Sequence, residues 1–292
     1  MQMSSSLSVM VNGIPGPMAT AVAEACLDRG LNILPLAFTG PGIQQNEVII
    51  KGAERTQWVE LVVGPGTNPK ASETLAKLKK EHPDLIVVDY THPSATLGNV
   101  ETYVENSVDF VMGTTGGDPD KINAALEKGT NIAVIAPNMA KQIVALQATL
   151  KDMAIKYPRS FEGYTLTVTE SHQSTKADTS GTAKAVVAHL IDLNGGNFDK
   201  AFEGIVKLRN KEDSMKFGVP EEFIDAGHAF HTYSMTSADG SVTFELKHNV
   251  CGRRVYAEGT ADAVEFIAKL QKEGTDKRVL TMMDILESEA MK

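Results

Sequence analysis

The segment from Glu170 to Lys184 holds the side chains with the clearest capacity for chemistry. His172 has an imidazole that exchanges protons near neutral pH, and Lys176 adds a cation four residues later. Ser180-Gly181-Thr182 then precedes an apolar run over 183–193 that is typical of a helix. Because the first turn of a helix presents N–H groups at its positive end, this turn predicts an anion site. The segment therefore predicts a pocket that holds a carboxylate and protonates the molecule carrying it. A polar loop with an ordinary helix cap is the alternative.

The composition is that of an ordinary protein whose length suits two domains. Of its 292 residues, 42% are hydrophobic and 22% are charged. The net charge of −9 argues against nucleic-acid and anionic-membrane partners, because both need a basic surface. Two cysteines are too few for a disulfide framework and indicate a reducing compartment. There is no apolar stretch long enough for a membrane span and no secretory signal, so we expect a cytoplasmic protein, or a plastid one if a transit peptide was removed.

The first half of the chain alternates apolar strands with helical runs. A strand over 7–11 meets a glycine turn, a helix follows up to Gly30, and a second strand is expected over 31–38. Strands separated by helices of this length form a parallel, doubly wound sheet. Later helices are expected over 70–80, 95–106 and 119–128, strands over 85–90, 109–112 and 131–136, and two marginal strands over 48–50 and 58–63.

The second half is richer in strands and predicts an α+β domain on a mostly antiparallel sheet. Asp239-Gly240 between two strand-like runs is a hairpin signal. We place this domain at 139–257, with the dinucleotide-binding domain formed by 1–138 and 258–292. The expected helices are 139–156, 183–193 and a final one over 261–272, and the expected strands are 164–169, 201–209, 228–236 and 242–249.

The glycine turn after the first strand is a loose form of the dinucleotide-binding motif. It reads Gly13-Ile14-Pro15-Gly16-Pro17-Met18-Ala19, with alanine in the third glycine position. The two prolines offer no N–H to a pyrophosphate, whereas Gly16, Met18 and Ala19 do. About twenty residues later, where NAD-binding proteins have a carboxylate on the ribose, Phe38-Thr39-Gly40 stands instead. NADPH is therefore tolerated, and NADH stays possible because no arginine favours the 2′-phosphate.

Two further turns follow strands of the expected parallel sheet. Asp89-Tyr90-Thr91 closes one strand and Gly113-Thr114-Thr115-Gly116 closes another. Ligands of open α/β sheets bind at the carboxyl ends of strands. Glycines there let the backbone approach a flat ring, and threonine hydroxyls can bond a carboxamide. Both turns are candidates for the nicotinamide site, with simple strand-to-helix turns as the alternative.

Taken in order, these motifs resemble those of the dihydrodipicolinate reductases of lysine biosynthesis. The resemblance rests on Val88-Asp89-Tyr90-Thr91-x-Pro93, the 113–116 turn, Ala136-Pro137-Asn138-Met139 and the 170–183 segment, and it covers nearly the full chain. The segments 228–231 and 250–257 are most similar to the plant-type branch. Gln173, at the position of a second histidine in the bacterial pattern, is also plant-like.

The resemblance implies a Rossmann-like domain and an NAD(P)H-dependent reduction of the dihydrodipicolinate synthase product to tetrahydrodipicolinate, in the diaminopimelate pathway. It implies that His172 is the general acid, that Lys176 is its partner and binds one substrate carboxylate, and that 180–182 hold the other. The family forms dimers or tetramers, and the plant-type branch favours dimers. The full candidate set for the substrate is Gln173, Ser180, Gly181, Thr182 and Arg253, and for the cofactor it is Gly13, Gly16, Pro17, Met18, Phe38, Thr39, Asp89, Tyr90, Thr91, Gly113, Thr114, Thr115, Ala136, Pro137, Asn138 and Met139.

Two other hypotheses stay open. A reductase-like protein that has lost catalysis would explain the altered glycine turn, although the retained His172, Lys176 and Ser-Gly-Thr turn argue against it. A different two-domain dehydrogenase acting on another small keto or imino acid is the third hypothesis. The spacing of His228, His231 and His248 is not a known ligand pattern, so we expect structural or surface roles for them and no metal.

Overall fold

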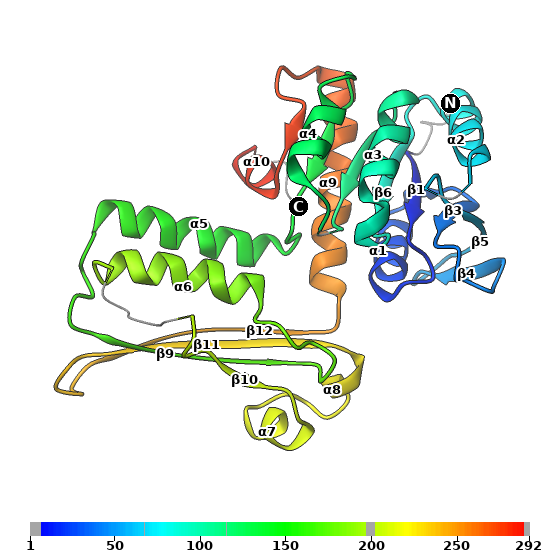
Figure 1. The fold of residues 1–292 in the computed structure, drawn as a ribbon. Helices are drawn as coiled ribbons and strands as arrows, with labels where there is room; N and C mark the ends of the chain where they lie inside the picture. The colour runs from blue at the N-terminus through cyan, green and yellow to red at the C-terminus, as the bar shows by residue number, and fades with distance from the viewer. Residues whose placement is uncertain (1–6, 67, 115, 197–201, 289–292) are drawn as a thin grey trace. The chain divides into compact units, whose positions relative to one another are not determined.

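The computed structural model describes residues 7–66, 68–114, 116–196 and 202–288 of the chain (Figure 1). It divides into two compact units: unit 1 is Met1–Lys141 with Arg254–Lys292, and unit 2 is Gln142–Arg253. The boundaries expected from the sequence, after 138 and after 257, differ from these by three and four residues. No helix among the described residues is long and apolar enough to cross a membrane.

Unit 1 contains the parallel sheet that the alternation of strands and helices predicted. Its six strands run in the order β13-β8-β7-β6-β1-β2, and each neighbouring pair is parallel. Both β1 and β6 are buried along their whole length, because helices cover parallel sheets on both faces. The strands are β1 (Ser8–Asn12), β2 (Asn32–Ile33), β6 (Ile86–Asp89), β7 (Asp109–Met112), β8 (Ala133–Ile135) and β13 (Val279–Leu280).

The helices of unit 1 pack their apolar sides against this sheet. One buried cluster joins Leu75 of α2 and Tyr103 of α3 to Phe110 of β7. Tyr103 also donates a hydrogen bond to Asp89 at the end of β6, so a core residue holds the carboxyl end of this strand in place. The helices are α1 (Pro17–Asp28), α2 (Lys70–Glu81), α3 (Thr96–Glu105), α4 (Pro119–Leu126), α9 (Arg254–Glu273) and α10 (Met282–Glu287), with a 3-10 turn η1 (Pro93–Ala95).

The apolar run at 31–38 forms two short strands, not the single strand expected. Pro35 has no N–H to donate and separates β2 from β3 (Leu36–Thr39). Strand β3 joins a second, three-stranded sheet in the order β3-β5-β4, with β4 (Glu47–Lys51) and β5 (Thr56–Val63). The end of β3 stays close to the glycine turn, because Gly13 N–H donates to the Phe38 carbonyl over 2.8 Å.

The last long helix begins earlier than expected, at Arg254 instead of 261. The sequence signal was misleading because Gly259 looks like a helix breaker. In the structure a Cβ at Gly259 would lie 1.8 Å from the Met139 carbonyl oxygen, so close packing requires glycine here. Asp262, one turn later and buried, accepts from Arg29, the residue after α1, over 2.7 Å and from Lys141 over 2.9 Å. These ion pairs connect α9 to the C-terminal end of α1 and to the start of α5.

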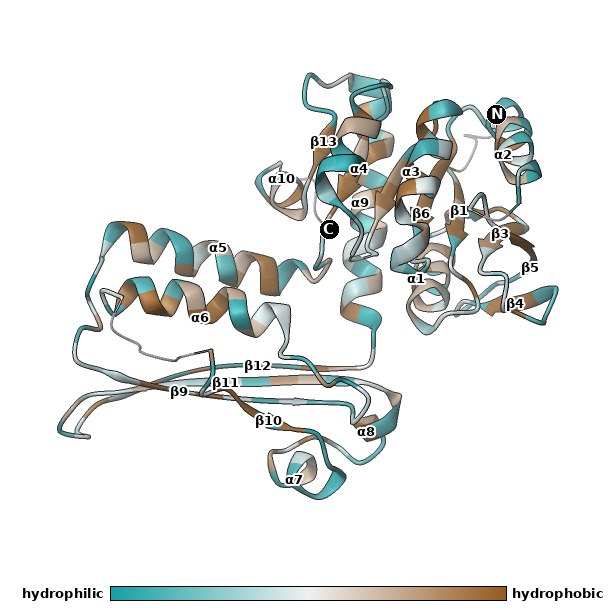
Figure 2. Ribbon diagram, viewed as in Figure 1, coloured by the Kyte–Doolittle hydropathy of each residue, from teal (hydrophilic) through white to brown (hydrophobic). Residues whose placement is uncertain are grey.

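Unit 2 is a four-stranded sheet with two long helices on one face (Figure 1). The strand order is β10-β9-β11-β12; β10 is parallel to β9 and the other pairs are antiparallel. Apolar residues recur between hydrophilic ones along both helices (Figure 2), and Leu190 packs with Val168 and Tyr233 in one buried cluster. The elements are α5 (Lys141–Lys156), β9 (Thr165–His172), α6 (Gly181–Leu193), β10 (Val206–Leu208), α7 (Lys211–Lys216), α8 (Phe223–Ala226), β11 (His228–Thr236) and β12 (Thr243–Cys251).

Unit 2 departs from expectation mainly around the reactive segment. Strand β9 continues to His172, whereas the sequence placed its end at 169. Strand β10 covers only Val206–Leu208 of the expected 201–209, and residue 201 lies outside the described residues. Helices α7 and α8 are too short to have a periodic signal in the sequence. The consequence is that Glu170 and His172 are fixed in a sheet instead of lying in a loop.

Candidate functional site

Strand pairing brings His172 together with a second buried histidine, His231. His231 lies directly opposite Glu170 on β9 and His248 on β12, and directly opposed residues share one face of a sheet. His172, two residues beyond Glu170, is on that same face. The Nε2 atoms of His172 and His231 are 3.2 Å apart, and His231 Nε2 is 3.7 Å from Glu170 Oε2. No local sequence pattern indicates this contact, because His231 is 59 residues from His172.

Both imidazoles are held neutral. Burial, followed by the charges of Arg209 and Lys176, lowers the pKa of His172 to about 4, and a hydrogen bond to the His228 backbone acts in the opposite direction. Burial likewise lowers the pKa of His231 to about 2. From the sequence we expected His172 to exchange protons near neutral pH. The structure makes it a neutral base there, because the sheet and helices remove it from water.

Glu170 organises the loop that follows β9. Its carboxylate is fully buried, forms an ion pair with Arg209 and accepts the Ser180 N–H over 3.0 Å. The Arg209 Nε also donates to the Lys176 carbonyl over 2.6 Å. Arg209 was not identified from the sequence, where it is a single arginine after a short strand. Arg209 and Glu170 together therefore connect the end of β9 to Lys176 and Ser180 of the loop that follows it.

The turn before α6 is a helix N-terminus, as expected, with two N–H groups already used. Ser180 is the N-cap residue; its N–H donates to Glu170, and its Oγ accepts the Ala183 N–H over 3.5 Å. Helix α6 starts at Gly181, where a Cβ would meet no atom within 4 Å. Space is therefore open beside Gly181 in the first turn, where the helix dipole is positive.

Three further candidate residues for the substrate, Lys176, Gln173 and Arg253, each form a polar contact within unit 2. Lys176 Nζ is 2.9 Å from Asp178 Oδ1. Gln173 donates to the Asp225 carbonyl over 3.0 Å, and Arg253 donates to the Ala226 carbonyl over 2.7 Å. The last two converge, because a Cβ at Gly227 would lie 3.3–3.4 Å from the guanidinium of Arg253 and from the amide of Gln173.

The other histidines have separate surroundings. His228 Nε2 is 2.9 Å from Ser171 Oγ on the opposite face of β9, and burial lowers the pKa of His228. His248 stacks on His231 with ring centroids 4.5 Å apart, and burial lowers its pKa to about 4. The expectation that all three histidines have structural or surface roles stays a prediction; His231 is buried and contacts His172. The donor atoms of Glu170, His172 and His231 lie within 4.8 Å of one another, close enough to share a metal ion.

Unit 1 has a cavity of about 500 Å³ at the carboxyl ends of β1, β3 and β6. Gly13 has φ +99°, and a Cβ there would lie 2.3 Å from the Tyr90 carbonyl oxygen, so only glycine gives this turn its shape. Among the described residues, no Asp, Glu, Lys or Arg lines the cavity. It fits a nucleotide in size and place. Its lining is Gly13, Gly16, Phe38, Thr39, Gly40, Pro41, Gly42, Ile43, Gly64, Gly66, Tyr90, Thr91, His92, Ser94, Ala95 and Asn99.

Replacement of Gly13 by alanine tests this geometry. The added methyl collides with the Tyr90 carbonyl and the backbone is strained, so we expect the free energy of unfolding to fall by about 1–3 kcal/mol. Nicotinamide nucleotide binding weakens as well. Thermal unfolding and a fluorescence titration with NADPH measure the two effects. Gly98→Ala of α3 is the matched control, because Gly98 does not line the cavity and a Cβ there would make an ordinary contact, 3.9 Å from Gly66 Cα; equal behaviour of the two variants would contradict the account.

The N–H groups of the glycine turn are fewer than the sequence indicated. Gly16 N–H donates to the Gly13 carbonyl over 2.8 Å within the turn, so it does not face a ligand. Pro17 is the first residue of α1 and has no N–H, and the helix has no side-chain cap. Met18 and Ala19 in the first turn are the remaining donors for a pyrophosphate.

The Asp89 side chain does not line the cavity but binds two residues that do, Thr91 and Asn99. Its carboxylate is fully buried and accepts from Thr91 Oγ1 over 2.7 Å, from Asn99 over 2.9 Å and from Tyr103 over 2.6 Å. These protein partners occupy the carboxylate, so the prediction that Asp89 belongs to the cofactor site concerns its backbone and its support of the turn. Tyr90 and Thr91 do line the cavity.

The turns expected at the nicotinamide lie at the same edge of the sheet, beyond the lining of this cavity. A Cβ at Gly113 would lie 2.3 Å from the Tyr90 ring, and Thr114 Oγ1 donates to the Thr91 carbonyl over 3.2 Å. Thr115 lies outside the described residues. Ala136 and Met139 are buried, Pro137 is exposed, and Asn138 Oδ1 accepts the Ala140 N–H over 2.9 Å.

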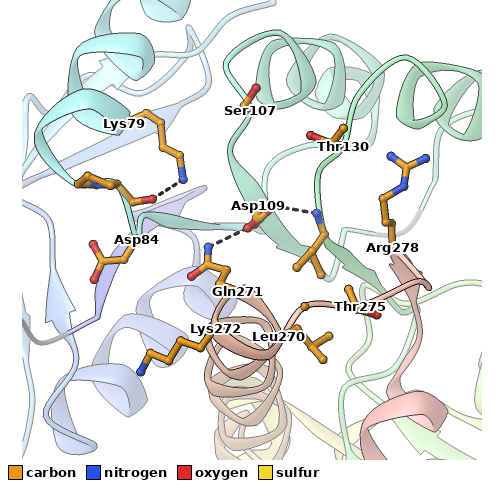
Figure 3. Close-up of a pocket in the computed structure, with 13 residues that line it drawn as sticks. Lys79, Asp84, Ser107, Asp109, Thr130, Leu270, Gln271, Lys272, Thr275 and Arg278 are labelled. Atoms are coloured by element: carbon orange, nitrogen blue, oxygen red, sulfur yellow. Dashed lines mark hydrogen bonds between the residues drawn. The ribbon is translucent and has the colours of Figure 1, made fainter.

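A second cavity, of about 650 Å³, lies at the opposite, amino-terminal edge of the sheet (Figure 3). Asp109 at the start of β7 accepts from Ile132 N–H and from Gln271, both over 2.7 Å. Lys79 donates to the Pro83 carbonyl over 2.7 Å. Because its polar groups bind one another and parallel sheets bind ligands at their carboxyl edge, this cavity is not the nucleotide site.

Comparison with known proteins identifies the family. The family models "Dihydrodipicolinate reductase, N-terminus" and "Dihydrodipicolinate reductase, C-terminus" match residues 7–139 and 143–286. The chain is 45% identical over 287 residues to 4-hydroxy-tetrahydrodipicolinate reductase 1, chloroplastic, of Arabidopsis thaliana, covering 98% of this chain and 79% of the relative. It is 40% identical to a probable chloroplastic reductase 2 of Oryza sativa subsp. japonica, covering 98% and 85%.

A solved structure agrees in fold. Dipicolinate-bound dihydrodipicolinate reductase from Paenisporosarcina sp. TG-14 superposes with a TM-score of 0.62 at 16% identity, over 94% of this chain and 97% of that one. The resemblance inferred from the motifs, including its plant-type character, is confirmed. The chain belongs to the dihydrodipicolinate reductase family.

Proposed function

We propose that the chain catalyses the NAD(P)H-dependent reduction of 4-hydroxy-tetrahydrodipicolinate to tetrahydrodipicolinate in lysine biosynthesis. The observation that supports it best is the buried His172 beside Lys176 and an open helix N-terminus, in a chain that matches the reductase family in both halves. The reaction consumes one substrate, one NAD(P)H and one proton, and yields tetrahydrodipicolinate, NAD(P)⁺ and water.

The substrate is a dianion, and unit 2 offers two positively charged positions that can bind its carboxylates. Lys176 exchanges its exposed partner Asp178 for one carboxylate, because an ion pair with an exposed aspartate is weak. The first turn of α6 at Gly181 holds the other carboxylate through N–H groups and the helix dipole. Gln173 and Arg253 converge at Gly227 and restrict the orientation of the ring between these positions.

His172 supplies the proton. Loss of the 4-hydroxyl group as water converts the substrate to a conjugated imine. When bound, the nicotinamide supplies the hydride, and hydride addition to this imine leaves negative charge on the ring. A positioned acid must neutralise that charge as it develops. The lowered pKa of His172 means that it must acquire a proton once the dianion is bound. Two carboxylates beside the imidazole raise its pKa, because a nearby anion favours the charged form.

The cofactor site is proposed for NADPH, with NADH accepted. The lining of the nucleotide cavity suits a dinucleotide, and Met18 and Ala19 offer N–H groups to its pyrophosphate. Phe38, Thr39 and Gly40 end β3 without a carboxylate, so a 2′-phosphate meets no repulsion there.

Gly40→Asp tests the cofactor preference. A carboxylate at this position repels the 2′-phosphate, so we expect kcat/KM for NADPH to fall about tenfold relative to that for NADH. Steady-state rates with each cofactor give this ratio. Gly40→Asn is the matched control, with nearly the same volume and no charge, and Gly40 has room for either side chain. An equal change in the two variants would show that charge at this position does not select the cofactor.

We further propose a homodimer as the assembled form. The edge strand β12 exposes Phe244, and Val206 of the opposite edge strand is also exposed, as at surfaces that associate. Sedimentation equilibrium distinguishes a monomer, dimer and tetramer. A plastid location is consistent with the chloroplastic plant relatives, as an alternative to the cytoplasm.

A coupled assay decides among the functional hypotheses. Dihydrodipicolinate synthase generates the unstable substrate from pyruvate and aspartate semialdehyde, and nicotinamide absorbance follows its reduction with NADPH and with NADH. Enzyme-dependent consumption of either cofactor supports the proposal. No consumption from folded protein would favour a non-catalytic protein or another substrate. Titration with NADPH then separates these two, because only a protein that retains the cofactor site binds it.

A further inference from the structure

We propose that Arg209 and Glu170 are positioning residues that hold the two carboxylate-binding positions of unit 2 at a fixed separation, and that this separation makes the site selective for a dicarboxylate. The inference rests on the proposed function and deepens it, because it explains how one exposed loop binds two anionic groups at once. Neither residue binds the substrate itself. Each acts through backbone groups of the loop.

The loop of residues 173–180 includes Lys176 and leads directly into Gly181, the two positions proposed to bind carboxylates. It joins the end of β9 to the start of α6 without helix or strand, and most of its residues are partly or fully exposed. Within the loop, the Lys176 N–H donates to the Gln173 carbonyl over 3.0 Å. A loop with few buried contacts samples many conformations unless other elements hold it. Contacts from outside the loop must therefore fix the distance between Lys176 and Gly181.

The Arg209 guanidinium makes one hydrogen bond with each of its five N–H groups. Two of them hold the loop: Nε donates to the Lys176 carbonyl over 2.6 Å, and Nη2 donates to the Asp178 carbonyl over 3.2 Å. The other three bind the Glu170 carboxylate, the Glu170 carbonyl and the Leu208 carbonyl. Because protein groups take up all five donors, Arg209 acts by fixing the loop backbone and not by binding a ligand.

Glu170 connects Arg209 to the other carboxylate-binding position. Its side chain is fully buried; Oε1 accepts from Arg209, and Oε2 accepts the Ser180 N–H over 3.0 Å. Since Ser180 is the N-cap residue of α6, the carboxylate fixes the residue next to Gly181. One buried ion pair therefore holds both positions, Lys176 through Arg209 and the start of α6 through Glu170.

Strand pairing places the ion pair independently of the loop. Strand β10 runs parallel to β9 as far as Leu208, which lies opposite Ser171, and Arg209 follows directly. His172 is held by a different pairing, opposite Ala229 of β11. We therefore expect loss of the Arg209 contacts to loosen the loop without moving His172.

A fixed separation favours a dicarboxylate over a monocarboxylate. When one carboxylate binds at Lys176, the other already lies at the start of α6, and its charge-assisted hydrogen bonds strengthen binding by about 10–100-fold. When the loop is loose, the entropy cost of ordering it cancels most of this gain. A monocarboxylate needs only one of the two positions, so its affinity does not depend on their separation.

Arg209→Lys tests the inference, because lysine keeps the charge but replaces a planar fork of five donors with three donors on one nitrogen. Dipicolinate and picolinate, which share a ring and differ by one carboxylate, are titrated calorimetrically into the full chain at saturating NADPH. We expect wild type to bind dipicolinate about 10–100-fold more tightly than picolinate. In Arg209→Lys this ratio falls below about threefold, and the affinity for picolinate changes by less than about threefold.

Steady-state rates separate positioning from a general loss of structure. In Arg209→Lys we expect KM for the substrate to rise about 10–100-fold and kcat to stay within about threefold, because His172 keeps its place in the sheet. Partial unfolding would instead lower kcat and the number of dipicolinate sites, and the remaining folded protein would keep the ligand ratio of wild type. Arg159→Lys is the matched control, since its ion pair with Glu162 is exposed and lies in the same unit; it keeps the ratio, KM and kcat of wild type.

The failures are distinguishable. If wild type is active in the coupled assay, a ligand ratio near one in wild type, or an unchanged ratio in folded Arg209→Lys, would overturn the inference and leave the proposed function standing. Wild-type protein that neither binds dipicolinate nor reduces the substrate would remove both.

Glu170→Gln replaces Arg209→Lys if that variant does not fold. The amide keeps the size of the side chain and an oxygen that can accept the Ser180 N–H, but the ion pair with Arg209 is lost. We expect the ratio of dipicolinate to picolinate affinity to fall in this variant as well. A ratio equal to that of wild type would overturn the inference.

Discussion

Replacement of His172 by glutamine lowers kcat by about 10²–10⁴-fold, the range that a general acid contributes. Glutamine keeps a polar group near His231 but cannot carry a titrating proton. Hydride transfer then leaves a ring anion that only solvent can protonate, and water reaches a 9%-exposed site poorly. The coupled assay under saturating cofactor measures kcat.

The controls for this variant separate chemistry from folding and cofactor binding. The dissociation constant for NADPH stays unchanged, because the nucleotide cavity is built from unit 1 and His172 belongs to unit 2. His189→Gln makes the same substitution on α6, outside the cluster, and keeps full activity. Wild-type kcat in His172→Gln would show that another group donates the proton.

Replacement of Arg209 by methionine destabilises unit 2 by about 3–5 kcal/mol, the cost of leaving a buried charge without its partner. Glu170 is fully buried, and Arg209 is the cation paired with it. Methionine fills similar space but leaves the carboxylate with the Ser180 N–H and the more distant His231. Hydrogen exchange of amides in β9 and β11 measures the free energy of opening this sheet.

Two comparisons isolate the buried charge as the cause. Arg159→Met breaks an exposed ion pair with Glu162, and its effect on stability is much smaller, because solvent screens exposed charges. Glu170→Gln combined with Arg209→Met removes both charges and recovers much of the loss. Fluorescence of the single tryptophan, Trp58 of β5, follows unit 1 and stays unaffected. Equal losses in the two arginine variants would mean that burial of Glu170 contributes nothing.

The sequence predicted the elements whose signals are local. Apolar runs separated by helical spacing placed the strands of the parallel sheet, because strands buried on both faces contain few polar residues. The hairpin signal at Asp239-Gly240 placed β11 and β12 within two residues of their observed ends. His172, Lys176 and the Ser180–Thr182 turn were predicted together because they are close in sequence.

The residues that escaped prediction depend on pairing between distant strands. His231 and Arg209 reach Glu170 only through the register of β9 with β11 and with β10, and no local pattern encodes a register. The burial of His172 could not be predicted either. Its lowered pKa results from the residues that pack over it and not from its neighbours in sequence. The burial of the Asp89 carboxylate was hidden for the same reason, since its partners Asn99 and Tyr103 follow on α3.

The interrupted layout of unit 1 has a consequence for how the chain matures on the ribosome. Unit 2 is one continuous stretch, Gln142–Arg253, whereas unit 1 needs α9 and β13 from the last forty residues to complete its sheet and to give Asp262 to Arg29. The part of unit 1 that precedes unit 2 therefore finishes folding only after α9 and β13 have been translated. Until then β8 is an uncovered edge of the unit 1 sheet that chaperones can protect, whereas unit 2 has all its own strands.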